Sequence, residues 1–93
     1  MKNLCDLEVG DKIFVWDCRW RKITIGEIVK KLYYDNVVFY DYRKIIGDVW
    51  DSDSHIIALP KDECQDRNKY YIVSMYQQLL ISSSIDDILE LIE

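Results

Sequence analysis

An apolar run that changes phase at a glycine constrains the fold of this chain more than any other feature. Side chains alternate between two faces over residues 23–25, the phase shifts by one residue at Gly26, and the alternation resumes over residues 27–32. Alternation with a period of two is typical of β-strands. A glycine at a phase slip indicates a β-bulge or a sharp bend, which is how the strands of small barrels turn corners. We therefore expect a strongly bent sheet.

The rest of the chain also reads mainly as strands separated by turns. In residues 12–17, Ile13 and Val15 alternate with Phe14 and Trp16, so we expect both faces of this strand to be covered. Further β-prone runs are residues 37–42, their continuation after a kink over 45–50, and residues 55–59, 69–75 and 79–81. Turns are expected at 34–36, in the DSDS segment 51–54 and near 77–78, and the polar connection 60–68 has room for one helical turn.

The C-terminal residues predict one amphipathic helix. Ser84 and Asp87 match S-x-x-D, a variant of the capping box that begins a helix. Apolar residues then recur at helical spacing, at Ile85, Ile88, Leu89 and Ile92. A helix this short does not persist alone in water, so its apolar stripe must pack on the sheet or against a partner. The predicted fold class is thus mainly β (α+β): a small antiparallel barrel or strongly bent sheet of about five to six strands with one short C-terminal helix, in a single domain over residues 1–93.

Composition predicts a soluble protein from a reducing compartment. No run approaches the roughly 18 apolar residues of a membrane span, and the N-terminus carries acidic residues where a signal peptide needs an apolar core. Cys5, Cys18 and Cys64 form no CxxC pair, which indicates neither a disulfide framework nor a zinc knuckle. We expect a cytoplasmic protein with no membrane contact, no metal and no cofactor.

The net charge of −5 conceals an uneven distribution along the chain. Residues 12–44 carry eight basic and four acidic side chains, a net +4, whereas residues 48–66 carry one basic and six acidic side chains, a net −5. The last ten residues add four more acids. Whether the acidic 48–66 region and the C-terminal helix mimic a nucleic acid is left open at this point.

Two segments of the first half resemble a known group of small barrels. The stretches VGDKIFV (residues 9–15) and IGEIVKK (residues 25–31) resemble the pattern of SH3-like barrels, including the KOW and Tudor-like groups. That resemblance implies a small barrel that serves as a binding module. The end of the chain, from YYIV (residues 70–73) through the short helix, resembles small uncharacterised tailed-phage proteins, which implies a phage-encoded protein in the host cytoplasm.

A basic loop with a tryptophan, CRWRK (residues 18–22), interrupts the strand pattern. Tryptophan and arginine dominate interface energies, because a rigid ring and a planar five-donor fork lose little entropy on binding. One interpretation is a contact loop for a partner. The other is a hairpin tip in which Trp20 folds back onto the mouth of the barrel and the cations are merely solvated.

More cations lie near this loop in the sequence and, interleaved with tyrosines, predict a basic stripe. Nucleic-acid binders use cations for phosphates and aromatic rings for base stacking. The acidic balance of the whole chain, with a pI near 4.8, argues against such a role. The predicted partner-binding residues are Arg19, Trp20, Arg21, Lys22, Lys30, Lys31, Arg43 and Lys44.

Signatures of catalysis are weak. Asp51, Asp53 and His55 would share one side of an extended chain, but a DSDS loop is explained as a solvated turn, and His55 has no activated nucleophile beside it. We therefore predict no catalytic residue. The expected function is a non-enzymatic interaction module that binds another protein and inhibits or redirects it, as a factor directed at a phage host or its defences. The alternative is a nucleic-acid- or nucleotide-binding module that uses the basic and aromatic residues 19–44.

Overall fold

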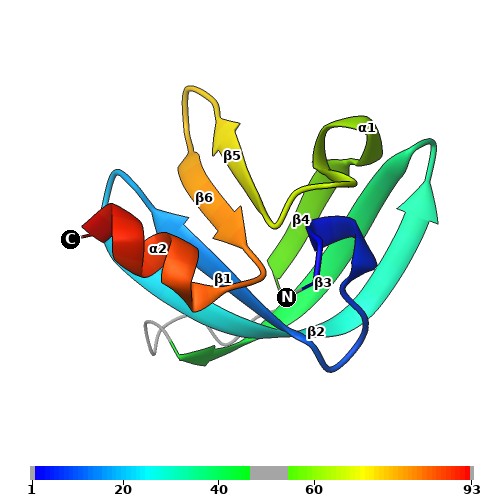
Figure 1. Ribbon diagram of the computed structural model, residues 1–93, viewed down its shortest axis with the longest axis horizontal. Coiled ribbons are helices and arrows are strands. Elements are labelled where there is room, and N and C mark those ends of the chain that lie inside the picture. Colours follow the sequence, from blue (N-terminus) through cyan, green and yellow to red (C-terminus); the bar gives the residue numbers. More distant parts are fainter. Residues whose placement is uncertain (1, 47–54, 93) are drawn as a thin grey trace.

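The structure, a computed structural model that describes residues 2–46 and 55–92, is mainly β. Six antiparallel strands form one sheet in the order β4-β3-β2-β1-β6-β5, which curls into a half-barrel (Figure 1). The strands are β1 (Lys12–Asp17), β2 (Lys22–Tyr34), β3 (Val37–Ile46), β4 (His55–Pro60), β5 (Lys69–Val73) and β6 (Gln78–Ser82). The helices are η1 (Leu4–Asp6), a 3₁₀ turn, and α1 (Lys61–Cys64) and α2 (Ile85–Ile92). The predicted fold class is confirmed, while the expected continuation over 47–50 and the 51–54 loop lie outside the described residues.

Two register shifts bend the pairing of β2 with β3. One lies between Ile25 and Gly26, at the predicted phase slip, but its extra residue is Ile45 on β3, and β2 pairs with β1 without a break across Gly26. The glycine has a packing reason to be there, because the ring of Tyr42 occupies the space that a Cβ would need. The other shift lies between Ile28 and Lys30, where Val29 of β2 is the extra residue. No glycine in the sequence indicates this shift. Bulges increase local bend and twist, so two of them help the long strand β2 to curl the sheet.

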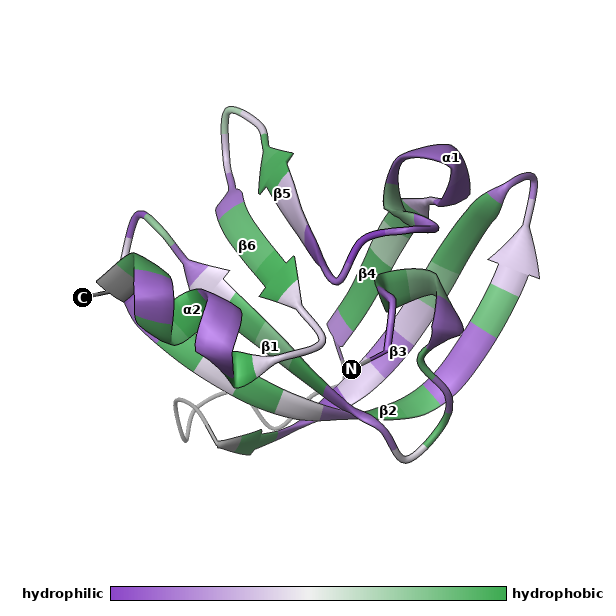
Figure 2. Cartoon of the chain, viewed as in Figure 1, coloured by the Kyte–Doolittle hydropathy of each residue, from purple (hydrophilic) through white to green (hydrophobic). Residues whose placement is uncertain are grey.

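Both faces of β1 are covered, as its alternation predicts. Ile13 and Val15 belong to the larger core, on the inner side of the curl, whereas Trp16 packs with Phe14 on the outer side beneath α2. Figure 2 shows the alternation as bands of apolar and polar colour along the strands. The inner core consists of Leu4, Leu7, Ile13, Val15, Ile28, Val38, Tyr40, Tyr42, Ile57, Leu59, Cys64 and Ile81.

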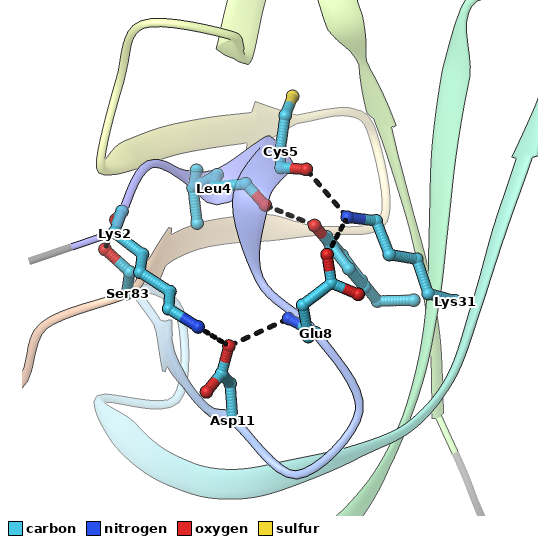
Figure 3. A network of polar contacts seen from close by, with 8 residues as sticks. Lys2, Leu4, Cys5, Glu8, Asp11, Lys31 and Ser83 are labelled. Atoms are coloured by element: carbon cyan, nitrogen blue, oxygen red, sulfur yellow. Dashed lines mark hydrogen bonds and ion pairs between the residues drawn. The ribbon is translucent and has the colours of Figure 1, made fainter.

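The N-terminal segment closes one end of the half-barrel. Leu4 is fully buried, its N–H donates to the carbonyl of Arg67 at 2.8 Å, and its carbonyl accepts the hydroxyl of Tyr40 at 2.6 Å (Figure 3). The hydroxyl of Ser83 donates to the carbonyl of Lys2 at 2.6 Å, which ties the segment to the chain that follows β6. Burial raises the pKa of Tyr40, so this hydroxyl stays protonated and continues to donate through the neutral pH range.

The helix α2 packs on the outer face of β1 and β6 through Ile88. The predicted capping box is wrong in its details. The hydroxyl of Ser84 accepts from the N–H of Asp86 at 3.3 Å, but the Asp87 carboxylate does not turn back to Ser84. It accepts instead from the hydroxyl of Ser82 at 2.6 Å and from the side-chain amide of Asn68 at 2.7 Å, because these buried or half-buried groups lie within its reach. None of the helices in the described part of the chain has the length and apolar character of a membrane span.

Candidate partner-binding surface

The loop 18–21 forms a tight tip between β1 and β2. The Asp17 carboxylate accepts hydrogen bonds from the N–H groups of Arg19, at 2.9 Å, and of Trp20, at 3.1 Å. The side chain of the residue that precedes the loop thus stabilises the turn. Arg21 takes a φ of 53°, which completes the reversal. The Trp20 side chain lies outside both cores and is 71% exposed. The loop is therefore ordered by local bonds that do not need the tryptophan.

A second hairpin tip lies beside the first one (Figure 1). The hydroxyl of Ser74 accepts from the N–H groups of Tyr76, at 3.2 Å, and Gln77, at 3.0 Å, so the chain leaves the strand there. The predicted strand over 69–75 consequently ends at Val73, and the turn comes earlier than expected. Met75 is 87% exposed and Tyr76 is 82% exposed.

Direct hydrogen bonds join the two tips. The N–H of Cys18 donates to the carbonyl of Gln78 at 2.8 Å, and Nη1 of Arg19 donates to the carbonyl of Tyr76 at 3.3 Å. Both tips carry exposed aromatic, aliphatic or cationic side chains. We call these residues together the hairpin-tip surface; they are Arg19, Trp20, Arg21, Val73, Met75 and Tyr76. The last three residues were not predicted, because the sequence pattern assigned Val73 and Met75 to a regular strand.

A cleft of about 940 Å³ opens beside this surface, at the end of the half-barrel away from η1. Trp20, Gln77 and Ile56 line it near the rim, and Lys22 and Lys44 reach it from β2 and β3. Deeper in the cleft, aromatic rings and apolar side chains pack together to form its wall. Among these, Tyr42 stacks on His55, with ring centroids 5.3 Å apart and planes inclined by 26°.

The structure does not gather the other predicted cations into one stripe. Arg43 lies on the outer face of the sheet, where it forms an ion pair of 3.4 Å with Glu27. Lys31 points to the closed end instead, where its Nζ donates to the carbonyl of Cys5 at 2.9 Å and lies 5.6 Å from the centre of the Tyr40 ring (Figure 3). Arg43 faces outward because it alternates with the buried Tyr42 along β3. On β2, the register shift between Ile28 and Lys30 places Lys31, rather than Lys30, opposite the buried Tyr40.

The described residues offer little for covalent or metal chemistry. Burial raises the pKa of the Cys64 thiol to about 11 and also raises that of Cys5, so both thiols are poor nucleophiles at neutral pH. Asp51 and Asp53 lie outside the described residues, and within the described ranges no group of three or more potential metal ligands comes together. Comparison with known proteins adds no identity: no family model, no curated protein and no solved structure matches the chain.

Proposed function

We propose that this protein is a non-enzymatic interaction module that binds another protein through the hairpin-tip surface. The observation that carries the proposal is the joint exposure of Trp20, Tyr76 and Met75 on two hairpin tips that hydrogen bonds hold together. Single exposed apolar residues are ordinary, but interaction sites are enriched in exposed aromatic rings, and each of the two joined tips carries one.

The fold itself gives no reason for this group of side chains. Asp17 and Ser74 organise the two turns through backbone N–H groups, and the side chains of Trp20 and Met75 take no part in those bonds. Arg19 is partly held by the carbonyl of Tyr76, so less side-chain entropy is lost when a partner binds. Exposed tryptophan, tyrosine and arginine side chains on adjoining loops have the composition of an interface hot spot.

The test is the affinity for a partner captured from a lysate of the host. Trp20→Ala and Tyr76→Ala should each weaken binding by about 30-fold or more, the effect of losing one hot-spot side chain. The matched control is Tyr34→Ala, because Tyr34 is 71% exposed like Trp20 but lies at the far end of β2. Melting curves should stay close to that of the wild type for all three variants. Unchanged affinity of Trp20→Ala and Tyr76→Ala for the captured partner would overturn the proposal.

We also propose an origin for the protein and an effect on its partner. An SH3-like barrel, a phage-encoded origin, and inhibition or redirection of the partner in the host cytoplasm are supported by the sequence resemblances alone. The neighbouring genes test the origin. A host or defence activity measured with and without the purified protein tests the effect, and an activity that does not change would contradict it.

A second candidate function is the binding of a nucleic acid or nucleotide in the cleft. It is favoured by one observation, that Trp20, Lys22 and Lys44 line the same cleft, although the basic stripe that the sequence predicts is dispersed. This function predicts that oligonucleotides or nucleotides quench tryptophan fluorescence at low salt, less so as salt rises, and not in Trp20→Phe. An absence of quenching at low salt would remove it.

A further inference from the structure

Apolar side chains remain exposed on the outer face of β2, β3 and β4, beside the part of the sheet on which α2 packs. Because Val38 and Tyr40 of β3 and Ile57 of β4 belong to the inner core, their neighbours along each strand point outward. The pairing of β2 with β3 places alternate residues of β2 on the same outer side. We call this region the outer apolar face; it consists of Leu32, Tyr34, Val37, Phe39, Ile56 and Ala58.

The strand pairing makes the outer apolar face one continuous patch. Leu32, Phe39 and Ala58 form one row across the three strands, and Tyr34 and Val37 form the next row on that side. Leu32 is 53% exposed and Tyr34 is 71% exposed. Together the six side chains expose roughly 500 Å², within the range of the largest apolar patch on a typical monomer. Patches of this size are often contact sites.

Charged residues stand in two rows beside the apolar ones. Glu27 of β2 lies opposite Arg43 of β3, with which it forms an ion pair of 3.4 Å. Lys30 lies opposite Asp41, but among the described residues no ion pair joins these two. Oδ1 of Asp41 is buried and has no hydrogen-bond partner in the described part of the chain. On the outer side of strands β1 to β4 and in the turn after β2, the charged residues are three cations and three anions: Lys12, Lys30, Arg43, Glu27, Asp35 and Asp41.

This arrangement is complementary to itself about one particular two-fold axis. If the axis runs along the strands between β2 and β3, it lays β2 of each copy over β3 of the other, and the two sheets pack in the aligned manner of β-sandwiches. Every residue of a row then faces its own cross-strand neighbour from the second copy. Lys30 faces Asp41, Glu27 faces Arg43, Leu32 faces Phe39, and Tyr34 faces Val37. An axis moved onto β3 would instead set the charged Lys30 against Ile56.

We infer that the outer apolar face joins two copies of this protein in a face-to-face, two-fold dimer. The dimer goes beyond the proposed binding of another protein, which uses the hairpin tips, and does not rest on it. The balanced charges of the face do not repel a second copy, and the second copy supplies the unpartnered Asp41 with a cation.

The size of the face sets the expected strength of the dimer. Full coverage of the apolar and charged rows would bury roughly 800 Å² of each copy, the contribution of one partner to a standard interface. Because the sheet curls across its strands, its outer side is convex and meets the second copy most closely along β2 and β3. We therefore expect a weak dimer in exchange with monomers, with dimers predominant above about 100 μM.

Sedimentation equilibrium of the full chain measures this exchange. Leu32→Glu places a carboxylate in the apolar row and should weaken the dimer by about 30-fold or more. Its melting curve at dilutions where only monomers exist should stay close to that of the wild type, since the side chain is half exposed. The matched control is Trp20→Ala, which removes an exposed ring elsewhere and should dimerise as the wild type does.

Charge reversal tests the two-fold arrangement itself. Lys30→Glu sets carboxylates of the two copies against each other, and Asp41→Lys does the same with ammonium groups, so each variant alone should dimerise at least about tenfold more weakly. Mixed in equal amounts, the two variants restore both ion pairs and should form mixed dimers with nearly wild-type affinity. If Asp41→Lys does not fold, Arg43→Glu mixed with Glu27→Lys makes the same test.

Three results would overturn the inference. These are a wild-type chain that stays monomeric up to about 1 mM, a dimer that Leu32→Glu leaves intact, and charge variants that remain monomeric when they are mixed. Failure of the proposed function looks different, because it concerns another surface. Tyr34→Ala should weaken the dimer and leave partner binding unchanged, whereas Trp20→Ala should do the reverse.

Discussion

Replacement of Gly26 by alanine is the most direct test of how this sheet is packed. A Cβ at this position would lie 3.1 Å from both Cγ and Cε2 of the Tyr42 ring, and closer still to Cδ2. The ring cannot move freely, since Tyr42 is buried and stacks on His55. The extra methyl group must therefore displace either the ring or the backbone of β2 beside the register shift.

The expected cost follows from these contacts. Overpacking a well-filled core costs about 1 to 3 kcal/mol, and a ring held on its other side belongs at the upper end of that range. A gain of about 0.5 to 1 kcal/mol arises because alanine restricts the unfolded chain more than glycine does. We expect a net loss of about 2 kcal/mol in the free energy of unfolding, which lowers the melting temperature by about 10 °C in a domain of this size.

Urea and thermal unfolding measure this loss, and a double-mutant cycle assigns it to the ring. Tyr42→Leu removes the ring, so Gly26→Ala should cost much less in the Tyr42→Leu background than in the wild type. A loss below about 0.5 kcal/mol for Gly26→Ala would refute the reasoning, since it would lie within the range of neutral substitutions. Equal losses in the two backgrounds would show that the ring is not the cause.

Two further positions give predictions about stability. Tyr40→Phe removes the hydroxyl that donates to the carbonyl of Leu4 and should cost about 1 to 3 kcal/mol in urea unfolding; no measurable loss would contradict this. Because burial raises the pKa of Tyr40 above its ordinary value of 10.0, its contribution is intact below pH 10 and is lost as the pH rises through the folded-state pKa. Wild-type stability should therefore fall more steeply above pH 10 than that of Tyr40→Phe, by up to about 1.4 kcal/mol per pH unit, and parallel curves would disprove the assignment. Asp87→Ala removes the acceptor for Ser82 and Asn68 and should cost about 1 to 3 kcal/mol, with faster amide exchange in α2, and unaltered exchange there would count against it.

Much of the fold could be predicted because its signals are local. Alternation across β1 predicts two covered faces, since an apolar strand face needs a core to pack against. The phase slip at Gly26 coincides with the first register shift, although the extra residue there lies on β3. The second shift, between Ile28 and Lys30, could not be predicted in this way. It depends on how β2 pairs with β3, and no residue at that point requires an unusual backbone.

The residues of the candidate surface could also be predicted only in part. Arg19, Trp20 and Arg21 stand out in the sequence because a tryptophan among cations has no role in a solvated turn. Tyr76 does not stand out, because its importance comes from contact with Arg19, a residue 57 positions away. Sequence distance hides such contacts from any periodic pattern.

By itself, the sequence determined the strands, the terminal helix and the uneven charge, because periodicity and turn chemistry act between near neighbours. Only the tertiary structure decided which residues share a surface. It sent Lys31 to the closed end of the half-barrel, joined the two hairpin tips and left one edge of β5 open. The physical reason is that register and curl are properties of the whole sheet, set by many pairings at once, and they alone bring distant segments of the chain together.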